Sequence, residues 1–178
     1  MYRDSGAWNA LMDRIARSVA MYLNAQLDAG AQAVQLFDSW VGCLGYDDYR
    51  RYVLPHTRTV FQLLRPGVPA IHFATGNPAL LPLLVEAGGT ALGVDWRCRL
   101  DHAAATAGPA RCLQGNLDPA VLFTSPEEVA RQTREMLEQV AGRNGYIANL
   151  GHGVLPHTPV ENVLAMIDTV HQWQGASG

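Results

Sequence analysis

The sequence predicts an α/β fold, because two kinds of segment alternate along it. Five short, mostly apolar runs are separated by longer segments in which apolar residues recur every three or four positions. The short runs are typical of strands covered on both faces, and the three-to-four period is typical of amphipathic helices. Parallel strands need crossover connections, which these helices supply. An open doubly wound sheet and a (β/α)8 barrel both satisfy the pattern, although five strands cannot close an eight-stranded barrel.

The first part of the chain contains two such units. A helix is expected over residues 8–29, with Gly30 as its stop, and a buried strand over residues 33–37. Residues 46–64 are helix-like, and residues 70–74 form the second expected strand.

The second part continues the alternation. The expected strands are residues 91–94, 111–114 and 146–150, and the expected helices are residues 78–87, 100–107, 125–141 and 158–173. Ser125 with Glu128 has the pattern of a capping box, and Thr158 with Glu161 repeats it at the last helix.

Composition limits the class of protein. At 178 residues and 48% hydrophobic, the chain is expected to form a single domain over residues 1–178. Thirteen basic against 16 acidic side chains give a net charge of −3, which does not favour nucleic acid as a partner. Three cysteines without close spacing suggest neither disulfides nor a metal site, and no apolar run is long enough for a membrane span. A cytoplasmic location is therefore expected.

Polar residues follow the expected strands, at positions where parallel strands would bring them to one rim. Such rims bind ligands in both candidate architectures. The candidates are Asp38, Ser39, Asp95, Asn116, Asp118 and His152.

Each candidate also has a structural interpretation. Asp38 and Ser39 could cap a turn, and Asp95 could form an ion pair or a cap. For Asn116 and Asp118 an Asx-Pro turn is the favoured interpretation.

His152 lies between two glycines, Gly151 and Gly153. Glycine permits close backbone approach or positive φ, so the segment fits either a ligand-facing histidine or a tight turn. Spacing alone leaves these alternatives open.

Four ordered segments resemble the C-terminal part of the uroporphyrinogen decarboxylase family. They are QLFDSWVGCLG at 35–45, ALGVDWRCRLDHA at 91–103, LQGNLDP at 113–119 and NLGHGVLPHTPVENV at 149–163. The resemblance implies a (β/α)8 TIM barrel, here a partial barrel of about five βα units. The implied reaction removes carboxyl groups from the acetate side chains of uroporphyrinogen III to give coproporphyrinogen III in haem biosynthesis, with no metal or organic cofactor.

The resemblance also implies roles for the candidates. Ser39 and His152 match residues that contact the tetrapyrrole substrate. Three further candidates match family motif positions: Asp95, Asn116 and Asp118. We expect these three, together with Asp38, to shape the rim.

The family's N-terminal Arg-Gln-Ala-Gly-Arg motif and its aspartate at the pyrrole nitrogens have no counterpart in this sequence. No catalytic residue is therefore assigned, and the chain is expected to be a C-terminal piece or split half that is inactive alone. Its expected partner is a complementing N-terminal half, or further copies joined through open strand edges. Two alternatives remain: a non-catalytic half that binds tetrapyrrole or completes a barrel, and a related cobalamin-dependent methyltransferase. Ala74 stands where the zinc-binding thiolate of that methyltransferase would lie.

Overall fold

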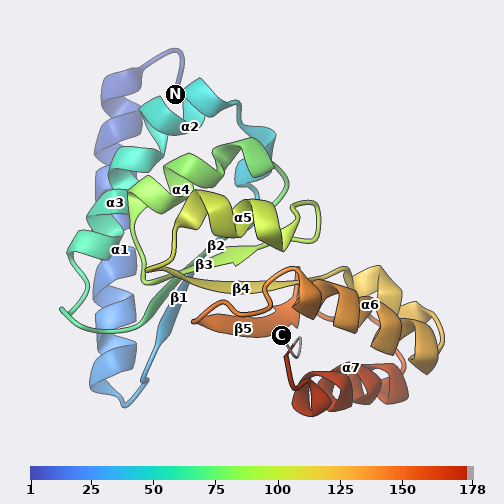
Figure 1. The fold of residues 1–178 in the computed structure, drawn as a ribbon. Helices are drawn as coiled ribbons and strands as arrows, with labels where there is room; N and C mark the ends of the chain where they lie inside the picture. The colour runs from blue at the N-terminus through green and yellow to red at the C-terminus, as the bar shows by residue number, and fades with distance from the viewer. Residues whose placement is uncertain (176–178) are drawn as a thin grey trace. The chain divides into compact units, whose positions relative to one another are not determined.

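The computed structural model describes residues 1–175 and has the α/β fold expected of a partial barrel of about five βα units (Figure 1). The chain divides into two compact units, Met1–Leu92 and Gly93–Gly178, which we describe separately. The third strand, β3 (Ala91–Val94), spans the boundary between them. Whether residues 1–178 behave as one domain stays a prediction.

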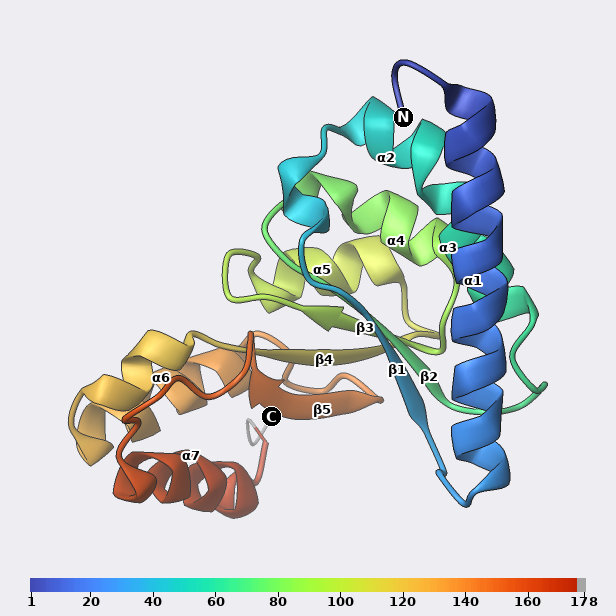
Figure 2. The ribbon, with the colours of Figure 1, turned by 180° about the vertical axis from the view of Figure 1, so that it is seen from behind.

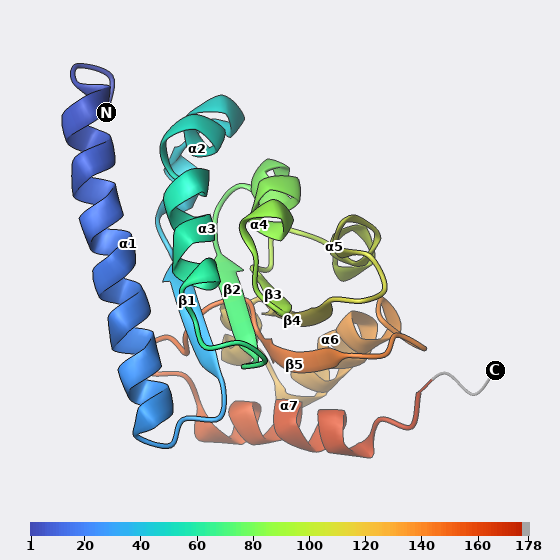
Figure 3. The ribbon, with the colours of Figure 1, turned by 90° about the vertical axis from the view of Figure 1, so that its left-hand side faces the viewer.

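The first unit contains two paired strands and four helices. Their bounds are α1 Ser5–Asp28, β1 Val34–Asp38, α2 Tyr46–Tyr52, α3 Leu54–Gln62, β2 Ala70–Ala74 and α4 Leu81–Ala87. Strands β1 and β2 are parallel, in a register that runs from Val34 opposite Ala70 to Asp38 opposite Ala74. Helix α1 lies alongside α3, and β1 beside β2 (Figure 3).

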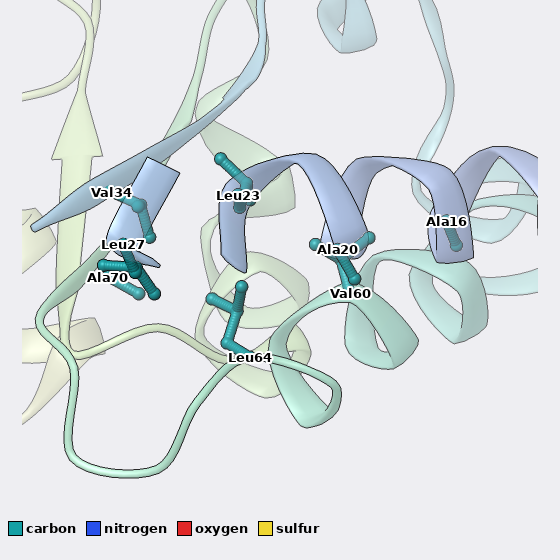
Figure 4. Packing of buried hydrophobic residues seen from close by; sticks show 8 residues of the cluster. All are labelled: Ala16, Ala20, Leu23, Leu27, Val34, Val60, Leu64 and Ala70. Atoms are coloured by element: carbon teal, nitrogen blue, oxygen red, sulfur yellow. The ribbon is translucent and has the colours of Figure 1, made fainter. Parts of the chain in front are cut away.

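Helices α1 and α3 enclose the core of the first unit together with the starts of β1 and β2. In Figure 4, Val60 of α3 faces Ala20 of α1, and Leu27 lies near Ala70. Small alanines let the helix backbones approach closely, and the leucines fill the remaining space. The full buried set is Ala16, Ala20, Leu23, Leu27, Val34, Val60, Leu64 and Ala70.

Three sequence predictions need correction in this unit. Residues 46–64 form two helices, because Pro55 stands in the first turn of α3, where its missing N–H costs no hydrogen bond. Likewise, residues 78–87 begin as a 3₁₀ turn over Pro78–Leu80 before α4. Strand β1 is buried only at its start, since the Phe37 side chain is 66% exposed.

The second unit contains the pair β4–β5 and three helices. Their bounds are α5 Leu100–Ala107, β4 Cys112–Leu117, α6 Pro126–Glu138, β5 Tyr146–Leu150 and α7 Val160–Gln172. Strands β4 and β5 are parallel, with Asn116 opposite Asn149, and the Tyr146 hydroxyl donates to the Gly115 carbonyl. Helix α6 packs on α7, as Figure 2 shows.

The helix starts of the second unit differ from their predicted caps. Ser125 Oγ accepts a hydrogen bond from the Glu128 N–H at 3.3 Å, as expected, but the Glu128 carboxylate binds Arg131 and Gln132. At α7 the predicted cap is wrong, because Pro159 holds the cap position and the Thr158 hydroxyl instead donates to the Leu155 carbonyl.

Within residues 1–175, no helix is both long and apolar enough to cross a membrane.

Candidate functional site

Asp38 is the last residue of β1, and Ser39 follows it directly. Neighbouring strand residues point to opposite sides, and Asp38 shares its side with Leu36. Both line an apolar cavity of about 190 Å³ between α1, α3 and β1. Asp38 therefore faces the helices of the first unit.

Burial raises the pKa of the Asp38 carboxyl from 3.8 to about 6. The pKa of the fully buried Tyr49 is also raised, by burial and by the nearby Asp38 carboxylate. The Asp38 carboxylate thus favours the uncharged form of Tyr49, whereas burial alone favours the uncharged form of Asp38. Sequence reasoning expected Asp38 beside the rim and had no sign of this pair.

Ser39 follows β1 and is held through its backbone. Its carbonyl accepts a hydrogen bond from the Thr75 hydroxyl at 2.5 Å, which joins the exits of β1 and β2. The backbones pack closely there: a Cβ on Gly42 would lie 2.5 Å from the Thr75 carbonyl oxygen and 2.6 Å from the Gly76 Cα. These contacts fix the backbone that carries the Ser39 side chain.

In the second unit, Asn116 joins two strand exits. Its side-chain amide donates to the Asp95 carbonyl at 2.8 Å and to the Cys98 carbonyl at 2.5 Å. Asn116 lies inside β4 and is only 8% exposed, so the Asx-Pro turn expected for it is wrong. A buried amide that meets two carbonyls removes two polar groups from water without leaving them unpaired.

Asp118, by contrast, makes the turn contact that the sequence suggests. Its carboxylate accepts from the Ala120 N–H at 2.9 Å and caps the 3₁₀ turn Pro119–Phe123. This contact accounts for its position before a proline.

Asp95 follows β3 directly and is almost fully buried, with 4% of its surface exposed. Its carboxylate accepts from the Arg97 backbone N–H at 3.0 Å and from the Arg97 guanidinium at 2.7 Å. The guanidinium stacks on the neighbouring Trp96 ring, 4.0 Å from the ring centroid. A buried carboxylate is thereby paired with a charge that reaches the surface.

His152 follows β5 and lies against the same indole. The imidazole and Trp96 rings meet edge to face, with centroids 6.2 Å apart and planes at 87°. The backbone approaches closely at Gly151, as expected, since a Cβ there would lie 2.4 Å from the backbone nitrogen of Trp96. Gly153 has open space at its Cβ position, and neither glycine has positive φ.

The second unit therefore brings Asp95, Asn116 and His152 around one segment, residues 95–98. Sequence reasoning did not select Trp96 and Arg97, which connect them. The sequence did contain a signal for Trp96 and Arg97: directly after an expected strand, Asp-Trp-Arg places an aromatic residue and a cation beside a carboxylate. Ser39 belongs to the first unit and His152 to the second, so their expected meeting at one rim stays a prediction.

No group of three or more His, Cys, Asp or Glu side chains that could hold a metal ion occurs among residues 1–175.

Comparison with known proteins gives consistent matches. The family model described as "Uroporphyrinogen decarboxylase (URO-D)" matches residues 1–173. A protein named uroporphyrinogen decarboxylase from Sorangium cellulosum is 53% identical over 99% of this chain and 51% of its own length. One of the same name from Streptomyces coelicolor is 52% identical over 96% of this chain and 48% of its own length. The chain thus spans about half the length of these relatives.

Among solved structures, a methyltransferase from Methanosarcina mazei superposes with a TM-score of 0.75 at 21% identity, over 86% of this chain and 46% of the other. That likeness concerns the fold alone. The family match covers nearly the whole sequence, and identity near 50% extends along it. The chain therefore belongs to the uroporphyrinogen decarboxylase family.

Proposed function

We propose that this chain forms part of a uroporphyrinogen decarboxylase, which converts uroporphyrinogen III to coproporphyrinogen III in the cytoplasm. The single observation that carries the proposal is the match to this family over residues 1–173. Ser39 and His152 would contact the substrate, and Asp38, Asp95, Asn116 and Asp118 would shape their surroundings.

The reaction defines what the protein must provide. Protonation of a pyrrole ring generates a cation, which accepts the electron pair of the breaking C–C bond as carbon dioxide leaves. Reprotonation of the exocyclic carbon and loss of the ring proton then restore the pyrrole and leave a methyl group. The protein accordingly has to bind carboxylates, orient the macrocycle and stabilise positive charge.

The half-length match supports a division of these tasks. The chain spans about half of each relative, and it has no counterpart of the arginine-rich motif or of the aspartate expected at the pyrrole nitrogens. We infer that this chain supplies substrate contacts and that a complementing half supplies the groups that stabilise the cation. The alternative function is a half that binds tetrapyrrole without participating in catalysis, since Ser39 and His152 would serve binding equally well.

The test is an anaerobic decarboxylation assay. The chain is supplied with uroporphyrinogen III alone and together with the remaining half of the Sorangium relative, and coproporphyrinogen III is followed by chromatography. We expect turnover only in the combined sample, and a His152→Ala variant should lower it at least about tenfold. His102→Ala is the matched control, because His102 is an exposed histidine of the same unit.

Robust turnover by the chain alone would contradict the need for a second half. If the combined sample shows no turnover but the chain binds coproporphyrin III saturably, the non-catalytic function is correct. If it neither turns over nor binds, the proposed function fails.

A further inference from the structure

Arg97 is held between a buried carboxylate and an aromatic ring. Its guanidinium donates to Asp95 at 2.7 Å and lies 4.0 Å from the centroid of the Trp96 ring. A free arginine samples many rotamers, so two contacts of this kind remove much of its conformational freedom before any ligand arrives. The Arg97 side chain nevertheless stays 46% exposed.

Trp96 connects Arg97 to His152. The guanidinium stacks on the indole, and the imidazole meets the same ring edge to face at 6.2 Å. The position of His152 is fixed in turn, because the Gly151 backbone lies directly against the Trp96 backbone nitrogen. Arg97 and His152 lie more than fifty residues apart in the sequence, and both contact the Trp96 ring.

The chemistry of this pair suits a carboxylate. A guanidinium has five N–H donors in a planar fork, and the hydrogen bonds to Asp95 involve one of the Arg97 side-chain donors. The geometry of the fork matches two carboxylate oxygens, and an imidazole can add a further donor. Asp95 balances the charge of Arg97, so recognition would depend on hydrogen-bond geometry more than on long-range attraction.

We propose that Arg97, together with His152, binds a carboxylate side chain of the tetrapyrrole, with Trp96 as the support for both. This inference rests on the proposed function, and it adds a residue to which the family resemblance assigned no role. Without a ligand contact, Arg97 would only close the turn at Asp95.

The experiment titrates coproporphyrin III, which has four carboxylates, into the 178-residue chain and into single variants. Arg97→Gln should weaken binding about tenfold, as expected when a charge-assisted hydrogen bond is lost. Arg97→Lys keeps the charge but loses the planar fork, and it should fall between wild type and Arg97→Gln. Arg99→Gln is the matched control: Arg99 is two residues away, is exposed and pairs with Asp101 at 2.6 Å.

Each outcome decides the matter. Unchanged affinity in Arg97→Gln, or an equal loss in Arg99→Gln, would overturn the role of Arg97 even where His152→Ala abolishes binding. Non-saturable binding by wild type would overturn the proposed tetrapyrrole site and this inference with it. If Arg97→Gln also lowers the melting temperature, the Arg97→Lys variant is the test. A well-folded lysine variant that binds coproporphyrin III with wild-type affinity would show that the planar guanidinium of Arg97 is not required.

Discussion

The two units hold their strand exits by different kinds of contact. In the first, the exits of β1 and β2 are joined by close backbone packing at Gly42, by the Thr75 hydroxyl, and by the Asn77 amide, which donates to the Leu44 carbonyl at 3.0 Å. In the second, the buried amide of Asn116 donates to two backbone carbonyls. The Trp96 ring there contacts both the Arg97 guanidinium and the His152 imidazole. Packing fixes a backbone, whereas a polar network also fixes the directions of side chains. What distinguishes the second unit is that a guanidinium and an imidazole, Arg97 and His152, contact one aromatic ring.

The largest expected effect tests the backbone contacts. Gly151→Ala places a Cβ 2.4 Å from the Trp96 nitrogen, where only the backbone can yield, so the free energy of unfolding should fall by more than about 3 kcal/mol. Gly153→Ala, with open space around it, should change it by less than about 0.5 kcal/mol. Urea denaturation measures both.

Gly42→Ala is the corresponding change in the first unit, and Gly45, which has open space, supplies its control. We expect a loss similar to that of Gly151→Ala. Equal stabilities within either glycine pair would show that the close approach in that unit does not constrain the fold.

The second prediction removes the polar tie of the second unit. Asn116→Ala leaves the Asp95 and Cys98 carbonyls without the amide donor and should cost about 3 kcal/mol. Asn149→Ala, opposite Asn116 on β5 but exposed, should cost less than about 1 kcal/mol. Thermal unfolding of the two variants compares them, and equal losses would contradict a special role for the Asn116 amide.

The smallest effect concerns charge in the first unit. The pKa of Asp38 in the folded protein, about 6, lies above its ordinary value of 3.8. The folded state therefore favours the protonated carboxyl, so the free energy of unfolding is highest below pH 4 and falls as the pH rises through 6. After allowance for its partial exposure, the loss at neutral pH is about 2 kcal/mol. Asp38→Asn should remove this pH dependence between pH 4 and 7, as measured by urea denaturation at each pH. A variant that follows the wild-type curve would place the titrating group elsewhere.

Periodicity and apolar runs were sufficient to predict the class of fold and three strands with their observed bounds, β2, β3 and β5. These signals are local, since a strand or helix buries the side that its own sequence makes apolar. Helix interruptions were missed, because Pro55 and Pro78 are tolerated in a first turn and so begin a helix as readily as they end one.

The site was less predictable for a physical reason. The sequence indicated that Asp95, Asn116 and His152 follow or end strands, but it could not show that the Asn116 amide reaches the Asp95 carbonyl or that Trp96 meets His152. Such contacts depend on strand register and on side-chain direction, which no single segment encodes. Asp38 illustrates the same limit, because the sequence placed it at the end of a strand but could not show that it lines the cavity between α1, α3 and β1.

The edge-to-face pair of Trp96 and His152 has a practical consequence for spectroscopy. The emission of an indole depends on the groups that surround it, so the fluorescence of Trp96 should change when a ligand arrives beside His152. With the other three tryptophans replaced by phenylalanine, the chain would contain its own optical indicator, which follows events beside His152 without an added dye.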